Sequence, residues 1–433
     1  MSAVLEPTPA RVRRVHRAWW VALLTLGALV ATAGFRSSTG ALLQPLEEEF
    51  GWSRATTSGA VTLNLVVYGL TAPFAAALMA RFGVRRVAAV ALVMVGLGSA
   101  LTTVMTAAWQ LWLLWGFAVG IGTGSVALVF GAIVADRWFV RHRGLVVGVF
   151  SGASSAGQLV FLPVIAVLAD GPGWRWAALV VAGTALVLAP AIWLLMADSP
   201  AAVGRRPYGA DPQSPVLAPE VPVGAARLAL VTLRDAARHR AFWILMATFW
   251  ICGWSTNGLI GTHFVAAAHD HGMPATTAAS MLALIGVFDL VGTIASGWLT
   301  DRVDPRLLLA VYYGLRGLSL LAVPWLLAEV VHPSLFVFIV FYGLDWVATV
   351  PPTIALCRAC FGPARAGVVF GWVFASHMVG AGAAALYAGV LREATGDYLA
   401  AWLTAGLLCL GAAVAVLLVP QGPVGTDAES PAL

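Results

Sequence analysis

The sequence predicts an all-α membrane protein whose twelve transmembrane helices form two halves of six. Three observations lead to this prediction. The chain of 433 residues is 60% hydrophobic and only 10% charged, whereas soluble domains carry about 25% charged residues. Its apolar residues fall into runs of roughly 18 to 25, long enough to cross a hydrocarbon core of about 30 Å. The two halves of the chain also resemble each other in their short polar loops.

The apolar runs define the predicted helices in chain order. They cover residues 19–42, 56–79, 84–106, 109–135, 144–168, 174–196, 241–265, 277–299, 307–328, 333–356, 366–390 and 398–419. Residues 1–18 and 420–433 are the predicted tails, and residues 19–196 and 241–419 are the two six-helix halves. Segment 197–240 is rich in proline and glycine, which predicts a linker between the halves.

Arginine supplies every fixed positive charge, because the chain contains no lysine. Of the 25 arginines, 20 fall in the N-terminal tail, the linker and alternate loops, and only Arg54, Arg175 and Arg392 fall in the loops between. Because cytoplasmic loops carry an excess of basic residues, both tails and the linker are predicted to be cytoplasmic. The same distribution accounts for the net charge of +5 without a nucleic-acid partner.

Two arginine-rich loops recur at one spacing. AALMARFGVR (76–85) aligns with GWLTDRVDPR (297–306) at an offset of 221 residues. The loop that starts at Arg137 aligns with the loop that starts at Arg358, again at an offset of 221. An internal repeat of six plus six helices is typical of transporters whose binding site lies between the halves.

Ionisable residues inside the membrane are the sharpest functional signal, because each costs at least about 2.5–3.5 kcal/mol at a helix centre. Four of them lie roughly 15–20 Å along their helices from the nearest polar end, at 1.5 Å per residue. These four are Asp289, Arg316, Asp345 and His377. We interpret them as a charge network near the membrane midplane, although Arg316 with Asp345 or Asp289 could equally be a static ion pair that fixes helix packing. Arg36 lies nearer the outer end of the first helix.

Uncharged polar residues predict the rest of a substrate site. Asn64 and Tyr68 are four residues apart and therefore share one face of the second helix. Gln158 belongs to a polar stripe on the fifth helix, and Asn257 belongs to one on the seventh. We assign all four to substrate binding, with hydrogen bonding between helices as the alternative role.

The loop GWLTDRVDPR is similar to the G-x-x-x-D-R-x-x-x-R loop of the major facilitator superfamily, and it stands at the position that the superfamily uses. The resemblance implies the major facilitator fold. It also implies a gating role for the residues of the loop that match the pattern, which are Gly297, Asp301, Arg302 and Arg306. In the first copy of the loop, Ala76 and Ala80 replace the glycine and the aspartate.

Within that superfamily, residues 34–54 and 143–168 resemble the monocarboxylate transporter family and its bacterial relatives, which include oxalate–formate exchangers. The resemblance covers essentially the whole chain. It implies a carrier for a small organic anion.

The same resemblance implies roles for three residues. Arg36 would receive the negative charge of the substrate, and Asp289 would carry or relay a proton. The family has an arginine four residues after this acid, where this chain has Thr293. Either Arg36 then binds the anion alone or Arg316 compensates. His377 stands where the exchangers use a lysine. A histidine there is a pH-dependent cation, which would bind the substrate or adjust the charge of the site.

The sequence therefore predicts a secondary active transporter of a small organic anion, in particular a monocarboxylate, that works by alternating access with proton or anion coupling. We expect it to be a symporter or antiporter in the cytoplasmic (inner) membrane of a bacterium, with no obligatory protein partner. No nucleotide-binding, nucleophile or zinc motif supports an enzyme, a cofactor or a bound metal. An exporter of drugs or metabolites on the same fold is the alternative. A non-transporting sensor would be expected to carry a large soluble domain.

Overall fold

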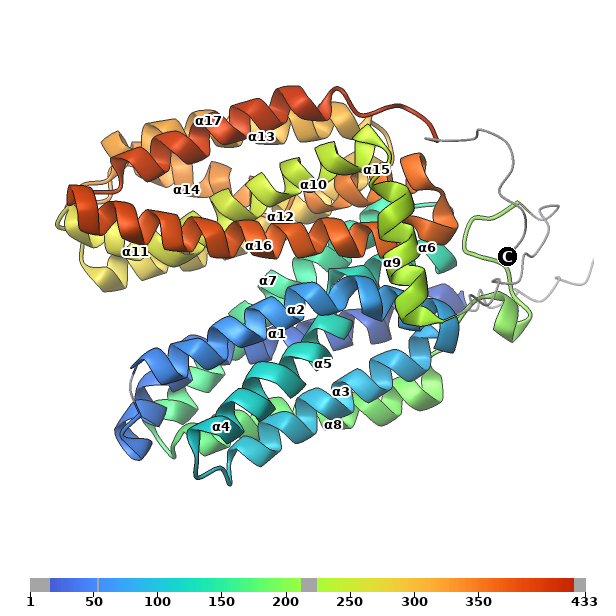
Figure 1. Cartoon of the computed structure of the whole chain (residues 1–433), viewed down its shortest axis with the longest axis horizontal. Coiled ribbons are helices and arrows are strands. Elements are labelled where there is room, and N and C mark those ends of the chain that lie inside the picture. The colour runs from blue at the N-terminus through green and yellow to red at the C-terminus, as the bar shows by residue number, and fades with distance from the viewer. Residues whose placement is uncertain (1–15, 53, 212–223, 424–433) are drawn as a thin grey trace, which may run out of the picture.

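Long helices account for nearly all of the chain that the structure describes. The computed structural model covers residues 16–52, 54–211 and 224–423. Within these ranges the side chains of some helical residues, including Arg36 and Gln158, lie outside the description. The helices run along one common direction in two groups, one from the blue-to-green first half of the chain and one from the yellow-to-red second half (Figure 1).

The first half forms six spans. Its helices are α1 (Arg17–Phe50), α2 (Arg54–Phe82), α3 (Val84–Thr102), α4 (Ala108–Leu111), η1 (Trp112–Val119), α5 (Gly120–Ser125), α6 (Leu128–Trp138), α7 (Arg143–Asp170) and α8 (Trp174–Leu195). The fourth span, predicted as one helix, consists of α4, η1, α5 and α6. It is π-helical in η1 and interrupted at residues 126–127.

The second half repeats this plan. Its helices are α10 (Arg240–Gly253), η3 (Trp254–Ile260), α11 (Gly261–Asp270), α12 (Ala275–Thr300), α13 (Pro305–Leu326), α14 (Pro333–Asp345), α15 (Val350–Phe361), α16 (Pro363–Thr395) and α17 (Leu399–Val416). The seventh span consists of α10, η3 and α11, with a π-helical centre. The tenth span consists of α14 and α15, and residues 346–349 interrupt it with turns.

Length and composition agree with a membrane fold. In the described residues, ten helical segments are long and apolar enough to cross a membrane, and a shorter apolar helix covers Arg17–Ala33. With the seventh span, the helices group into the twelve spans that the sequence predicts. The all-helical fold of two six-helix halves is therefore confirmed.

Local chemistry explains where individual helices begin and end. The Asp304 carboxylate accepts a hydrogen bond from the backbone N–H of Arg306 at 2.9 Å, and Pro305 occupies the first turn, so α13 begins with a capped end. Gly51 (φ 65°) and Gly396 (φ 86°) follow α1 and α16. Both lie in the left-handed region, which favours a residue without Cβ and ends the helix.

The two halves pack together mainly where α7 meets α12 and where α2 meets α16. Glycines allow the α7–α12 backbones to approach closely. A Cβ on Gly297 would lie 2.3 Å from the carbonyl oxygen of Gly144, and a Cβ on Gly148 would lie 2.6 Å from that of Thr293. Small residues at such contacts are the usual means of close helix packing in membranes.

The linker adds two short helices, η2 (Ala201–Val203) and α9 (Ala225–Ala236). Helix α9 crosses the spans at one end of the bundle (Figure 1), where it contacts α2 of the first half and α16 of the second. The Trp372 indole on α16 donates to the carbonyl oxygen of Ala229 at 3.1 Å. The loops of both repeat copies lie at this end, which we call the arginine-rich end; they include Arg81, Arg137, Arg302 and Arg358.

Candidate functional site

The polar centre of the second half surrounds the interruption in the tenth span. Helix α14 ends at Asp345 and α15 begins at Val350, so the turns at 346–349 leave backbone groups without helical partners. The interruption at 126–127 in the fourth span corresponds, by the repeat offset of 221, to residues 347–348. Interrupted helices at matching positions in the two halves are a common setting for a transporter binding site.

Arg316 on α13 is fully buried and forms hydrogen bonds at the end of α14, where the interruption begins. Its Nε donates to the Asp345 carboxylate at 2.6 Å. Its Nη2 donates to the backbone carbonyls of Asp345 and Trp346, the latter at 3.2 Å. Its Nη1 reaches Cys252 Sγ at 3.2 Å and Ser255 Oγ at 3.5 Å. These contacts employ all three guanidinium nitrogens inside the protein, and the ion pair is with Asp345.

Asp289 on α12 holds the opposite side of the interruption and also reaches the first half. One carboxylate oxygen accepts from Thr293 Oγ1 at 2.8 Å and from the backbone N–H of Val347 at 2.9 Å. The other oxygen accepts from Ser155 Oγ on α7. All three donors are neutral, and in the described part of the chain no cation forms an ion pair with this fully buried acid. Asp289 therefore joins the two halves and the interruption through uncharged partners.

His377 on α16 lies between aromatic rings beside the seventh span. Its ring centroid is 4.9 Å from that of Phe249 and 6.0 Å from that of Phe374, to which it is stacked. Nε2 lies 3.4 Å from the Asn257 amide nitrogen in η3. When that amide nitrogen donates, Nε2 must be the unprotonated nitrogen and Nδ1 carries the hydrogen. Nδ1 is buried and has no hydrogen-bond partner among the described residues.

The predicted residues of the first half differ in what they contact. The Asn64 amide donates to the carbonyl oxygen of Trp115 at 2.7 Å, which joins α2 to η1. The Tyr68 ring lies 5.6 Å from Phe374 of the second half, so Tyr68 stands at the interface close to the His377 ring stack. The side chains of Arg36 and Gln158 lie outside the described residues, and their roles stay predictions.

The residues of the predicted gating loop fall into two pairs by what they contact. Asp301 accepts hydrogen bonds from the backbone N–H groups of Gly144 at 2.7 Å and Leu145 at 3.1 Å, in the first turn of α7. Together with the Gly297 contact, these bonds tie the loop to the other half. Arg302, in the turn after α12, instead stacks on Trp298 near the end of that helix, 3.9 Å from the ring centroid. Arg306 pairs with Asp304 at 2.6 Å, also within the second half.

A further contact between the halves was missed by sequence reasoning. Asp136 on α6 forms an ion pair with Arg358 on α15, and Arg143 lies 3.6 Å from the same oxygen. The position of Asp136, directly before the repeated loop that starts at Arg137, could have indicated an ion pair with an arginine of the other copy. This ion pair adds to the Asp301 bonds in closing the arginine-rich end.

Ion pairs at the opposite end stay within one half. Glu49 pairs with Arg175 at 2.6 Å, and Asp270 pairs with Arg392 at 2.6 Å. Hydrogen bonds from Arg175 and then Trp174 hold the pKa of Glu49 below its usual range. In the described chain, the polar contacts between halves thus lie at Asp289 and at the arginine-rich end, which means that the halves are closed together there.

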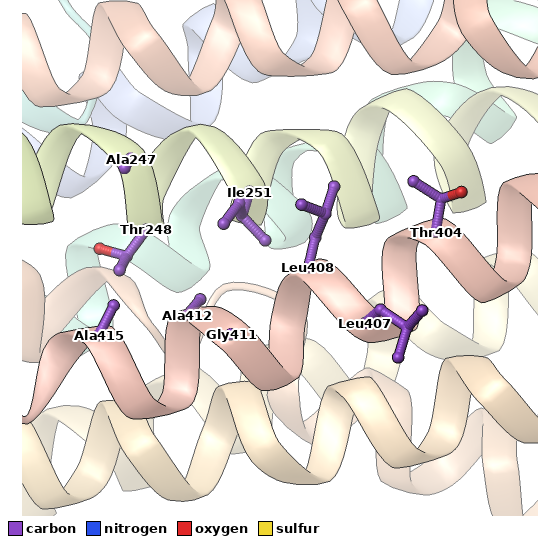
Figure 2. A pocket seen from close by; sticks show the side chains of 9 residues that line it. All are labelled: Ala247, Thr248, Ile251, Thr404, Leu407, Leu408, Gly411, Ala412 and Ala415. Carbon is purple, nitrogen blue, oxygen red and sulfur yellow. The ribbon is translucent and has the colours of Figure 1, made fainter.

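A cavity of about 370 Å³ lies away from this interface, between α10 and α17 on the flank of the second half (Figure 2). It is lined by Ala247, Thr248, Ile251, Thr404, Leu407, Leu408, Gly411, Ala412 and Ala415. None of the residues that contact Asp289 or Arg316 belongs to this lining. The cavity is therefore separate from the polar centre.

The fold and the polar centre define a multi-pass membrane transporter with two six-helix halves. The sequence profile of the Major Facilitator Superfamily matches residues 24–385 and 264–432. The chain belongs to this superfamily, as the loop at 297–306 predicted. The members of this superfamily are transporters, which are not enzymes.

Two proteins with similar sequences place the chain more closely within the superfamily. The chain is 25% identical over 387 residues to the "Uncharacterized MFS-type transporter YcxA" of Bacillus subtilis (strain 168), covering 86% of this chain and 88% of the relative. It is 28% identical over 433 residues to human "Monocarboxylate transporter 11", covering 96% of this chain and 86% of the relative. The resemblance to the monocarboxylate transporter family is confirmed.

Solved structures share the fold. The Escherichia coli fucose:proton symporter FucP superposes with a TM-score of 0.69 at 15% identity, covering 94% of this chain and 100% of FucP. The human organic anion transporter MFSD10 superposes with a TM-score of 0.71 at 18% identity, covering 93% of this chain and 100% of MFSD10.

Proposed function

We propose that this protein moves a small organic anion, in particular a monocarboxylate, by alternating access and couples that movement to a proton or a second anion. Relatives named as monocarboxylate transporters, which align over nearly the whole chain, support the substrate class. The arginine distribution supports an orientation with both termini and the arginine-rich end in the cytoplasm. Similarity to the Bacillus subtilis transporter supports the cytoplasmic membrane of a bacterium as its location.

The observation that carries the coupling proposal is the set of neutral donors around Asp289. A buried carboxylate is costly unless a cation or a proton neutralises it. Here three hydrogen bonds from Ser155, Thr293 and Val347 stabilise the ionised form, and no ion-paired cation competes with a proton in the described residues. Asp289 can therefore gain and lose a proton without breaking a salt bridge.

The same contacts link that proton to movement. A protonated carboxyl group donates from one oxygen, so a hydroxyl partner such as Ser155 must reverse and accept, whereas the backbone N–H of Val347 can only donate. Reversal of the Ser155 bond changes the contact of α7 with α12, and weakening of the Val347 bond frees the interruption before α15. Helix α15 carries Arg358, whose ion pair with Asp136 closes the arginine-rich end. Protonation thus favours separation of the halves at that end.

For the substrate, we assign the carboxylate to Arg36 and the remaining contacts to residues of both halves. The other proposed binding residues are Asn64, Tyr68, Gln158, Asn257 and His377. The buried Nδ1 atom of His377, which has no hydrogen-bond partner in the described chain, supports this assignment. Arg316 is left out of the substrate site, since its guanidinium is occupied by Asp345 and the carbonyls of the interruption.

The test is uptake into proteoliposomes from a panel of labelled carboxylates, with and without an imposed pH gradient. We expect accumulation of a short monocarboxylate that the gradient increases. The Asp289→Asn variant should keep substrate-for-substrate exchange and lose gradient-driven accumulation. Asp397→Asn, an exposed acid at the opposite end, is the matched control and should behave as the parent.

Two results would contradict the proposal. Full gradient-driven uptake by Asp289→Asn would remove the proton role of this residue. Transport of bulky neutral or cationic compounds, without any carboxylate, would instead support an exporter of drugs or metabolites.

A further inference from the structure

We propose that the cavity between α10 and α17 binds one anionic phospholipid from the membrane leaflet at the arginine-rich end. An acyl chain would occupy the cavity, and the phosphate would bind Arg240. The proposal concerns a lipid site on the flank of the second half and does not depend on the identity of the transported substrate.

The dimensions of the cavity fit an acyl chain of one leaflet. Small residues on α17 and α10, including Gly411, Ala412 and Ala247, leave the space between the two helices (Figure 2). Along α17 the lining runs from Thr404 to Ala415, which is roughly 16 Å at 1.5 Å per residue. This is about half of a hydrocarbon core that is about 30 Å thick. The cavity is therefore about as long as one leaflet is deep, and it extends along α17 from near the arginine-rich end past the middle of the helix.

The flank that contains the cavity is built to face lipid. Leu407, which lines the cavity, is 62% exposed, and Val414 on the same helix is 66% exposed. Trp243 on α10 is also exposed, and its indole donates to the carbonyl oxygen of Ala237 at 2.8 Å. Tryptophan with an apolar body and a hydrogen-bonded tip is typical of the boundary between lipid and water. The α9–α10 corner thus marks the membrane surface.

A cation stands where the head group would lie. Arg240, at the start of α10, is exposed, and its Nη2 donates to the carbonyl oxygen of Leu418 at 3.3 Å. Leu418 lies three residues beyond Ala415 at the end of the cavity, about 4.5 Å along a helix. In the described part of the chain Arg240 has no acidic partner, whereas the neighbouring Arg306 is neutralised by Asp304.

These charges select an anionic head group. A guanidinium binds phosphate through two parallel N–H groups, and within the described chain Arg240 forms one hydrogen bond, to the carbonyl oxygen of Leu418. Arg238, two residues earlier, is also exposed and adds positive charge at the same corner. A neutral lipid could fill the apolar cavity equally well, so the head group is what distinguishes the ligand. Basic sites between helices on the cytoplasmic side commonly bind anionic lipids.

The experiment measures lipid retained by the purified full-length protein, using native mass spectrometry. The probes are phosphatidylglycerol and phosphatidylcholine with identical chains, supplied in equal amounts. We expect the parent to retain phosphatidylglycerol preferentially. Arg240→Gln should lower the ratio of the two lipids roughly fivefold, because one arginine near an anionic lipid contributes about 1 kcal/mol. Arg240→Lys should keep most of the preference, since the charge remains.

A second variant tests the acyl chain separately. A Cβ on Gly411, which lines the cavity, meets no atom within 4 Å. Gly411→Phe should therefore be tolerated at the backbone, place its ring in the cavity and reduce retention of both lipids. The controls are Arg86→Gln, an exposed arginine at the start of α3, and Gly183→Phe, where a Cβ on α8 also meets nothing within 4 Å. Both should retain lipid as the parent does.

Three outcomes would overturn the proposal. The parent could retain the two lipids equally, or Gly411→Phe could retain phosphatidylglycerol at the parental level. Displacement of phosphatidylglycerol by glycerol 3-phosphate at the same concentration would show that the site takes a soluble phosphate and not a lipid.

Discussion

The Arg316–Asp345 ion pair allows a quantitative prediction, because both partners and their surroundings are buried. Arg316→Gln removes a pair joined at 2.6 Å and leaves the Asp345 carboxylate without its cation. The Oδ1 atom of that carboxylate already lacks a hydrogen-bond partner within the described chain. Removing one partner of a buried pair costs about 3–5 kcal/mol, because the remaining charge is uncompensated.

The variant that restores stability identifies the true partner. Combining Arg316→Gln with Asp345→Asn removes both charges, and such neutral replacements are often close to neutral in stability. We expect the double variant to recover to within about 2 kcal/mol of the parent, since only the carbonyls at the interruption lose a charged donor. Combining Arg316→Gln with Asp289→Asn should not restore stability, because Asp289 is bonded to neutral groups.

The assay is unfolding of the purified protein in mixed micelles by titration with a denaturing detergent, together with its abundance in membranes. Arg302→Gln is the control, since this exposed arginine only stacks on Trp298 and bonds the carbonyl oxygen of the same residue. It should change the free energy of unfolding by about 1 kcal/mol or less. Parental stability of Arg316→Gln combined with loss of transport would refute the structural role and return Arg316 to the substrate site.

Three further predictions concern the anion site, the orientation and the closed end. Arg36→Ala should abolish carboxylate uptake while Arg36→Lys keeps part of it, because the charge survives without the planar geometry; equal uptake by Arg36→Ala and the parent would exclude a substrate role. Cysteines replacing the exposed Ala202 in the linker and Ala394 at the opposite end test the topology in intact cells. An impermeant maleimide should label only the second, and labelling of the first would reverse the orientation. Gly297→Ala should lower the free energy of unfolding by about 1–3 kcal/mol, the usual cost of overpacking, because its Cβ would lie 2.3 Å from a backbone oxygen of α7. Gly286→Ala on the same helix meets nothing within 4 Å and should be neutral, so equal stability of the two variants would contradict the close packing.

The fold could be predicted from the sequence because its signals are local. Each span is an apolar run that can be found within a window of about 19 residues. The arginine bias is likewise a property of short loops, and the repeat offset needs only two aligned segments. The loop at 297–306 therefore led to the superfamily, and the depths of Asp289 and Asp345 followed from counting along a helix.

Partners inside the membrane could not be predicted in the same way. Ser155 is 134 residues from Asp289, and Asp136 is 222 residues from Arg358. Which side chains meet depends on how each helix is rotated and how closely α7 and α12 approach, and neither is encoded in hydropathy. The interruptions at 126–127 and 346–349 could not be predicted from hydropathy either, because apolar turns and apolar helices have the same composition. Sequence alone thus predicted that charges lie near the membrane midplane. The tertiary structure decided that Arg316 and Asp289 hold opposite sides of one broken helix, because only packing brings a guanidinium to its free carbonyls and a carboxylate to its free N–H.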